Sequence, residues 1–198
     1  MKLDDSRPLW LISPRSLRVA TQSLRIGLDD WIVKNASVLK AVLRTLFGAF
    51  WLIDGALKFQ PGFIDVFSGS VTASGQPAWL AGWFNFWASA ISSNTAFFVY
   101  STGVLEIAIG TCLVLGLMRK LAFTASFIVG LLIWSVPEGF GGPYGPGSTD
   151  IGTGIIYALA SVLFLVVSAS FGPSRYSLDF QIEKRFSGWK RIAEVKSA

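Results

Sequence analysis

The stretch AVLRTLFGAFWLIDGALKF, residues 41–59, decides the fold of this chain. It is long and apolar enough to cross a bilayer, which takes about 20 residues. It nevertheless contains Arg44, Asp54 and Lys58. An ionised side chain near the bilayer centre costs at least about 2.5 kcal/mol, which favours its burial against other helices or in a wet cavity. This helix therefore needs companion helices from the rest of the chain.

A polar stripe runs along one face of this predicted helix. Residues three and four apart share a helix face. Five residues of the stretch follow that spacing: Arg44, Gly48, Trp51, Gly55 and Lys58. We expect this face to pack against the other helices, with Asp54 beside it.

The composition indicates a membrane protein of one domain. The 198 residues are 52% hydrophobic and 15% charged, whereas a soluble domain has roughly 25% charged residues. The net charge of +5 reports orientation in a membrane protein more often than nucleic-acid binding. The sequence has no histidine and a single cysteine, Cys112, so it lacks the usual ligands of haem, zinc and iron–sulfur clusters. We expect no metal site, and any redox chemistry must use an organic carrier or a partner's cofactor.

Four membrane-spanning helices are predicted, over residues 37–59, 95–117, 121–136 and 151–170. The second has one charge, Glu106, close to its middle. Gly103 and Gly110 share its face, and such small residues let helices approach closely. The expected fold is therefore an all-α integral membrane four-helix bundle over residues 36–171, with the Glu106 carboxyl facing its interior.

Both ends of the chain are basic and amphipathic. Residues 1–35 have a helical repeat of apolar residues flanked by arginines, which is typical of a helix lying on the membrane surface. A loosely ordered tail or a docking segment for a partner are the alternatives. Residues 172–198 form a basic tail. No continuous apolar region or cleavage site follows the early Lys2 and Arg7, which argues against a secretory signal.

Basic residues are distributed unevenly around the predicted spans. Seven lie in residues 1–40 and six lie in the tail, whereas residues 60–94 and 137–150 contain none. The positive-inside rule therefore predicts that both termini are cytoplasmic. The chain is expected to be a multi-pass protein of the cytoplasmic (inner) membrane.

Two unusual segments are expected on the outer side. Residues 78–92 place Trp79, Trp83 and Trp87 four residues apart, which favours a short helix at the bilayer interface. The alternative is an aromatic wall for a flat ligand such as a quinone ring. The second segment, residues 138–154, is rich in glycine and contains Tyr144 and Asp150. We expect a structured loop at a helix mouth, with Ser148, Thr149 or Asp150 as the N-cap of the last span.

The predicted site is a cavity that opens outward beneath this loop and the tryptophan helix. Its predicted catalytic residues are Glu106, Asp54 and Lys58, because a carboxyl in a low dielectric can exchange a proton. Glu106 can also serve only as a hydrogen-bonding group between helices. Asp54 and Lys58 can simply neutralise each other at i,i+4, and Arg44 can extend to the membrane surface.

The motifs resemble those of the DoxX/DoxD family, specifically the DoxD-type small subunit of thiosulfate:quinone oxidoreductase. The resemblance rests on R-x3-G-x5-D-G-x2-K-F from Arg44 to Phe59, on Glu106, and on GGPYGPGSTDIG at 141–152. It covers residues 37–170. The family implies a four-helix membrane protein with a second small subunit, and its DoxD branch implies oxidation of thiosulfate to tetrathionate with electrons passing to quinone.

The predicted function is therefore a membrane subunit of a quinone-linked oxidoreductase acting on a sulfur compound. The residues expected at the substrate or quinone are Trp83, Trp87, Tyr144, Asp150 and Arg44. A dianionic substrate should meet cationic groups, yet Lys58 is the only cation of the predicted outer half. A partner would have to supply positive charge, or the chain acts on something else. The alternatives are a non-catalytic anchoring subunit of a larger membrane complex and, ranked lowest, an ion-coupled carrier.

Overall fold

The computed structural model describes residues 14–71, 77–141, 151–171 and 175–194, and over these residues it is all-helical, with no strand. The long helices are α1 (Pro14–Leu57), α4 (Thr95–Leu115), α5 (Arg119–Ser135) and α6 (Thr153–Phe171). The shorter α-helices are α2 (Phe63–Val71), α3 (Ala81–Ser93), α7 (Leu178–Glu183) and α8 (Lys190–Ala193). Short 3-10 turns lie at η2 (Ala78–Leu80), η3 (Gly139–Gly141) and η4 (Ser187–Trp189).

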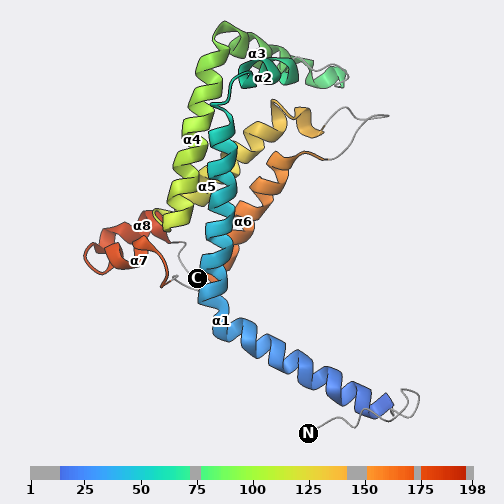
Figure 1. The fold of residues 1–198 in the computed structure, drawn as a ribbon, viewed down its shortest axis with the longest axis vertical. Coiled ribbons are helices and arrows are strands. Elements are labelled where there is room, and N and C mark those ends of the chain that lie inside the picture. Colours follow the sequence, from blue (N-terminus) through green and yellow to red (C-terminus); the bar gives the residue numbers. More distant parts are fainter. Residues whose placement is uncertain (1–13, 72–76, 142–150, 172–174, 195–198) are drawn as a thin grey trace.

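The long helices form two pairs that join side by side. Helix α1 packs along α4, α5 packs along α6, and the two pairs meet mainly through α4 and α5. Helices α2 and α3 lie at one end of this arrangement, and α7 and α8 lie at the other (Figure 1). We refer to these as the α2–α3 end and the α7–α8 end.

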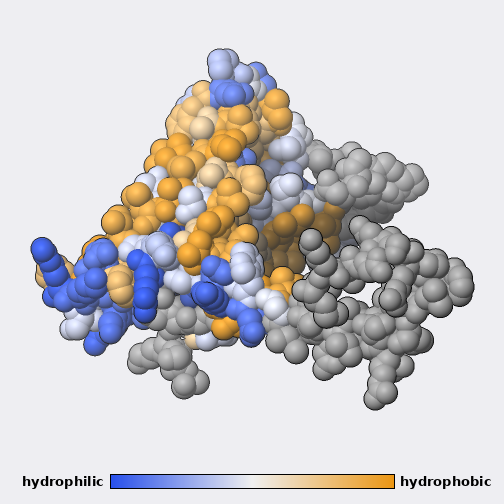
Figure 2. All heavy atoms as spheres, turned by 60° about the horizontal axis from the view of Figure 1, so that its bottom comes forward, coloured by the Kyte–Doolittle hydropathy of each residue, from blue (hydrophilic) through white to orange (hydrophobic). Residues whose placement is uncertain are grey.

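Three helices are long and apolar enough to cross a membrane, at Gly27–Leu57, Thr95–Leu115 and Thr153–Ser170. Figure 2 shows a broad hydrophobic flank between hydrophilic surfaces toward the two ends, as a membrane protein requires. The prediction of an all-α membrane protein is confirmed at this level. Helix α5 coincides with the predicted third span but has only 17 residues, so a fourth crossing stays a prediction.

The predicted surface segment and the first predicted span share one helix. Helix α1 continues without interruption through residues 35 and 36, where the surface segment and the membrane domain were expected to divide. Figure 1 shows that the N-terminal part of α1 points away from the bundle. Because no proline falls between Pro14 and the end of α1, nothing in the sequence breaks the backbone hydrogen bonds there.

Glycines bring both helix pairs into backbone contact. A Cβ atom on Gly110 of α4 would lie 2.7 Å from the carbonyl oxygen of Gly48 in α1, and one on Gly55 would lie 2.8 Å from that of Gly103. In the second pair, a Cβ on Gly154 would lie 2.6 Å from the Gly130 oxygen. These distances leave no room for a side chain, so both pairs use the small-residue packing of membrane helices.

The predicted polar stripe of α1 is the face that packs inward. Arg44, Gly48, Trp51, Gly55 and Lys58 are all buried. Trp51 is fully buried, and its ring contacts those of Phe47 and Tyr157 edge-on. The predicted inner face of α4 is confirmed in the same way, because Gly103, Glu106 and Gly110 are buried.

Candidate functional site

Asp54, Lys58 and Glu106 form an ionic group, here called the Lys58 cluster. The Nζ atom of Lys58 lies 2.7 Å from Oε2 of Glu106 and 3.5 Å from Oδ1 of Asp54. The close approach of α1 and α4 at Gly55 and Gly103 makes the first contact, since Gly103 is one turn before Glu106. The sequence grouped these three residues in one candidate site without predicting their contact, and the structure places them together.

Burial differs sharply across the Lys58 cluster. The Glu106 side chain is fully buried and that of Lys58 is 10% exposed, whereas that of Asp54 is 39% exposed. The Lys58–Glu106 contact is an ion pair, and neither Glu106 oxygen is among the side-chain atoms with a hydrogen-bond partner in the described residues. A buried polar group without such a partner is costly. The cluster is therefore incompletely satisfied at Glu106 and reaches solvent through Asp54.

A cavity of about 430 Å³ lies beside this cluster at the α2–α3 end. Asp54 and Lys58 line it, while Glu106 sits behind Lys58. The rest of the wall is mostly apolar, with aliphatic side chains of α3, α4 and α5. Its aromatic side chains are Phe63, Phe67, Trp87 and Phe98. The volume falls in the range of small-molecule sites, about 300–1,000 Å³.

Trp87 lines this cavity, but its indole nitrogen is buried and has no acceptor among the described residues. Lys58 Nζ lies 5.5 Å from the centre of the Phe63 ring, a distance typical of a cation–π contact. The cavity thus combines apolar walls with a cation that can meet an acceptor atom.

Glu138 closes another side of the cavity by holding the start of α6. Its Oε1 accepts hydrogen bonds from the amide and the hydroxyl of Thr153, and its Oε2 accepts one from the amide of Gly154 at 2.9 Å. A carboxylate is favourable there because the first amides of a helix lack partners within it. This role was not foreseen, because Glu138 precedes α6 by fifteen residues and no local capping pattern marks it.

The structure gathers only part of the predicted ligand-binding set. Trp87 lines the cavity. Trp83 contacts the Trp87 ring edge-on and donates its indole N–H to the carbonyl oxygen of Ser135 at 3.0 Å, so it supports the wall from behind. Tyr144 and Asp150, like the predicted N-cap of the last span, lie outside the described residues.

The structure does not bring Arg44 to this cavity. Arg44 is not among the cavity residues and lies toward the α7–α8 end. It donates from Nε to the oxygen of Leu113 at 2.8 Å and from Nη2 to that of Tyr176 at 2.9 Å. The stripe that contains both Arg44 and Lys58 spans fourteen residues, about 21 Å along a helix at 1.5 Å per residue. One helix face therefore serves both ends of the bundle.

A second buried ionic group, here called the Asp179 cluster, lies at the α7–α8 end. Asp179 is fully buried and accepts hydrogen bonds from the amides of Met118 and Arg119 at 2.8 and 3.0 Å, from Arg119 Nε at 2.9 Å and from Trp189 Nε1 at 2.8 Å. Arg119 also contacts Glu183 and Glu194 at 3.4 Å. The basic tail is thus packed against the turn between α4 and α5.

Burial raises the pKa of the Glu183 carboxyl above its ordinary value, and the nearby charge of Glu194 raises it further. Arg119 acts in the opposite direction but does not cancel these effects. Glu183 and Glu194 face the same Arg119 guanidinium and compete for it. The protonated form of Glu183 is therefore favoured.

Comparisons of the chain with protein-family models, with curated proteins and with solved structures found no match. The resemblance to the DoxX/DoxD family therefore stays a prediction from the motifs. Within the described residues, no group of three or more potential metal ligands is close enough to hold an ion. The site has to be interpreted from its own geometry.

Proposed function

We propose that this chain is the membrane subunit of a quinone-linked oxidoreductase and that the cavity at the α2–α3 end holds the quinone ring. The observation that carries this proposal is the cavity itself, about 430 Å³, with four aromatic side chains in its wall and the Lys58 cluster on one side. Flat apolar molecules with a few polar atoms favour such pockets. The resemblance to the DoxD branch is consistent with the same class of ligand.

Quinone reduction consumes two electrons and two protons, and the residues of the cavity are suited to the proton part. Lys58 can donate a hydrogen bond to a ring oxygen of a quinone, and Trp87 offers its ring to the flat face of the quinone. Asp54 is partly exposed and can take protons from water, and Lys58 connects it with Glu106. Glu106 lies 2.7 Å from Lys58 and can hold the ammonium in place. Electrons have to come from a partner's cofactor.

The cavity favours a neutral ligand over a sulfur dianion. Asp54, Glu106 and Glu138 lie around it, with Lys58 as its only cation among the described residues. A negatively charged site repels a dianion such as thiosulfate. Any oxidation of a sulfur compound would therefore occur on a partner subunit. We place the chain in the cytoplasmic membrane with four spans and both termini inside, in line with the distribution of its basic residues.

An anchoring subunit without its own chemistry is the second candidate. It is favoured by the N-terminal part of α1, which leaves the bundle (Figure 1) and exposes Leu28, Trp31 and Val33. Such a segment offers a surface for another protein. If the chain is only an anchor, removing residues 1–35 should disrupt the complex. The unmodified protein should then not bind quinone.

Quinone binding to the purified full-length protein tests the proposal. A short-chain quinone should quench the tryptophan fluorescence of the protein in lipid nanodiscs. Ile133→Trp places a large ring in the cavity wall and should weaken binding at least tenfold. Leu121→Trp puts the same residue on the exposed face of the same helix, outside the cavity, and should leave the affinity unchanged. Equal affinities in the two variants would refute the cavity as the site.

Turnover in native membranes separates binding from proton handling. Glu106→Gln and Asp54→Asn should still accumulate and bind quinone, but should lower quinone reduction. Unchanged turnover in both variants would remove the Lys58 cluster from the mechanism. Quinone-independent ion flux into proteoliposomes would instead support the carrier alternative.

A further inference from the structure

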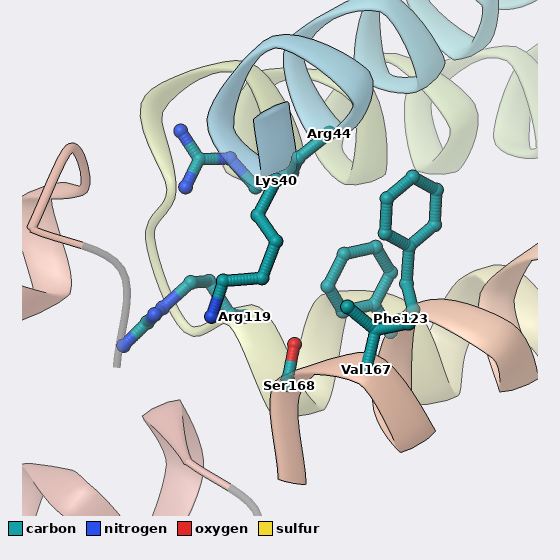
Figure 3. Close-up of a pocket in the computed structure, with 7 residues that line it drawn as sticks. Lys40, Arg44, Arg119, Phe123, Val167 and Ser168 are labelled. Carbon is teal, nitrogen blue, oxygen red and sulfur yellow. The ribbon is translucent and has the colours of Figure 1, made fainter. Parts of the chain in front are cut away.

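A surface groove, here called the α5 groove, adjoins the quinone cavity. It has a volume of about 400 Å³ and follows α5 from Ile128 to Ser135. Leu132 lines both the groove and the cavity and is 40% exposed, so the two spaces meet at this side chain. By contrast, the pocket between α1, α5 and α6 at the α7–α8 end (Figure 3) encloses only about 20 Å³, little more than the roughly 10–15 Å³ that one water molecule needs.

The lining of the α5 groove is almost entirely apolar. The indole N–H of Trp83 donates to the carbonyl oxygen of Ser135 at 3.0 Å, and that of Trp134 donates to the oxygen of Ile151 at 2.8 Å. Both indole N–H groups are therefore already bonded to the backbone. Since a polar headgroup buried here would lack hydrogen-bond partners, the groove favours a hydrocarbon chain.

Phe140 lines the end of the groove in an unusual backbone conformation. Its φ is 59°, in a region that bulky side chains rarely adopt. Its ring lies 5.0 Å from that of Trp134 and 6.3 Å from that of Trp83, measured between ring centres. Such strain persists only where the surrounding structure requires it, and it is frequent at ligand sites. The three rings thus form a fixed aromatic wall at this end of the groove.

The other end of the groove leads toward the middle of the bundle. Ile128 is 51% exposed and lies one turn before Leu132, farther from the α2–α3 end. A hydrocarbon chain that leaves the cavity over Leu132 and continues to Ile128 therefore runs away from the partly exposed Asp54. The groove follows about 10 Å of helix at 1.5 Å per residue. It can hold the first part of a long chain, and the rest would lie in the bilayer.

We propose that the α5 groove binds the isoprenoid tail of a membrane-resident quinone whose ring occupies the cavity. This inference rests on the proposed function and names its substrate class, a quinone with a long apolar tail. The ring stays beside Lys58, and the isoprenoid tail passes over Leu132 to Ile128. Because lipid is as apolar as the groove, the gain in affinity comes from packing against a preformed wall and is moderate.

Two quinones with the same ring test the groove, one without a tail and one with two isoprenoid units. Their affinities for the full-length protein in phosphatidylcholine nanodiscs are measured by tryptophan quenching. Ile128→Trp fills the groove and should weaken binding of the tailed quinone at least fivefold, with the tailless quinone unaffected. Leu121→Trp is the matched control, because Leu121 lies two turns earlier on the same face of α5, is also 51% exposed and lines neither space. It should change neither affinity.

The outcomes separate this inference from the proposed function. If the tailless quinone does not bind the parent protein, the proposed function fails and the groove proposal fails with it. If the ring binds but the tailed quinone keeps the same advantage in Ile128→Trp and Leu121→Trp, only the groove is refuted, and the isoprenoid tail lies in bulk lipid. An equal loss of both quinones in Ile128→Trp would also refute the groove, because the variant would then act on the ring.

Photochemical labelling locates the isoprenoid tail without any variant. A quinone whose tail ends in a diazirine should label residues 128–135, and an excess of the unlabelled tailed quinone should prevent this. Label spread evenly between Leu121 and Ile128 would overturn the proposal. A phosphatidylcholine with a diazirine in its acyl chain is the second probe. If it labels the groove equally with and without added quinone, a lipid chain occupies the groove and the proposal is refuted.

Discussion

The Lys58 cluster and the Asp179 cluster both bury carboxylates against a cation, but they differ in how completely those carboxylates are bonded. Asp179 accepts four hydrogen bonds, two from backbone amides and two from side chains. Glu106 is equally buried but faces Lys58 alone, and neither of its oxygens has a hydrogen-bond partner among the described residues. The Asp179 cluster holds the C-terminal helices against the bundle, whereas the Lys58 cluster keeps a charge available beside a cavity.

The surroundings of the two clusters support this distinction. Asp179 lies between the start of α5 and the C-terminal helices, and its own amide donates to the oxygen of Gly116 at 3.1 Å. Lys58 is in the wall of a cavity of about 430 Å³. A fully bonded buried network rigidifies a structure, whereas an incompletely bonded one is costly and persists where function uses it. The comparison predicts that equivalent mutations at the two clusters have different consequences.

Asp179→Ala should have the largest effect on stability. It removes the acceptor of two amides and leaves the Arg119 guanidinium, 7% exposed, without its closest carboxylate. Removing one partner of a buried ion pair costs about 3–5 kcal/mol. We expect a lower thermal unfolding midpoint and protease cleavage near residues 175–194, with quinone affinity unchanged. Asp65→Asn, at an exposed position of α2, serves as a control. It should neither lower the unfolding midpoint nor expose residues 175–194 to protease. If Asp179→Ala abolished quinone binding, the two ends would not be independent.

The sequence predicted the Lys58 cluster better than the Asp179 cluster because helical periodicity is local. Asp54 and Lys58 are one turn apart, and both inner helix faces follow from residues three, four and seven positions apart. The shared candidate site of Lys58 and Glu106 followed from charges in two apolar spans, which have to avoid lipid. Their contact could not be predicted, because helix boundaries are uncertain by a few residues.

No local pattern predicted the Asp179 cluster. Asp179 bonds with the amides of residues 118 and 119, about sixty positions earlier, and the surrounding tail appeared only as a basic segment. The turn it holds contains Gly116 in the left-handed region, at φ 66°, where glycine is favoured. A glycine followed by a basic pair indicated a turn, but not which carboxylate would cap the next helix. The position of Arg44 away from the cavity was unforeseen for the same reason, since periodicity gives the face of a helix but not which end of that face meets a cavity.

Lys58→Met should destabilise the protein less than Asp179→Ala, by about 3 kcal/mol or less. It leaves Glu106 buried without a cation, but Glu106 can take up a proton instead of staying charged. The double variant Lys58→Met with Glu106→Gln should recover most of the loss, because a neutral pair replaces the ion pair. Thermal unfolding of the two single variants and the double variant in detergent measures this coupling. If the stability lost in the double variant equals the sum of the losses in the two single variants, the two side chains do not depend on each other.

Gly55→Ala should have an intermediate effect and should act mainly on the Lys58 cluster. The new Cβ would lie 2.8 Å from the Gly103 oxygen and 3.0 Å from the Glu106 Cβ, so α1 and α4 have to separate. Such overpacking costs about 1–3 kcal/mol, and it should weaken quinone binding by moving Glu106 away from Lys58. Gly82→Ala meets no atom within 4 Å and is the matched control, expected to be neutral or slightly stabilising. Equal unfolding midpoints for the two variants would contradict the close packing of α1 and α4.

Glu183→Gln should have the smallest effect, and its sign depends on pH. The folded protein raises the pKa of Glu183 above its ordinary value of 4.5, first by burial and then through the charge of Glu194. Between these two pKa values the folded chain holds more protons than the unfolded chain, so the contribution of Glu183 to stability falls as pH rises through this interval. Glutamine stays neutral and avoids that loss.

Unfolding midpoints of the parent and of Glu183→Gln should therefore coincide near pH 4 and separate as the pH increases, with the variant becoming slightly more stable. The contact between Glu183 and Arg119 at 3.4 Å works against this gain, so we expect only a few tenths of a kcal/mol, as for most substitutions near a surface. A variant that instead loses stability at pH 7 would show that the attraction of Arg119 outweighs burial and the charge of Glu194. In that case the carboxylates of the Asp179 cluster would strengthen the docking of the tail without competing for one cation, and the contrast with the Lys58 cluster would be larger than the structure indicates.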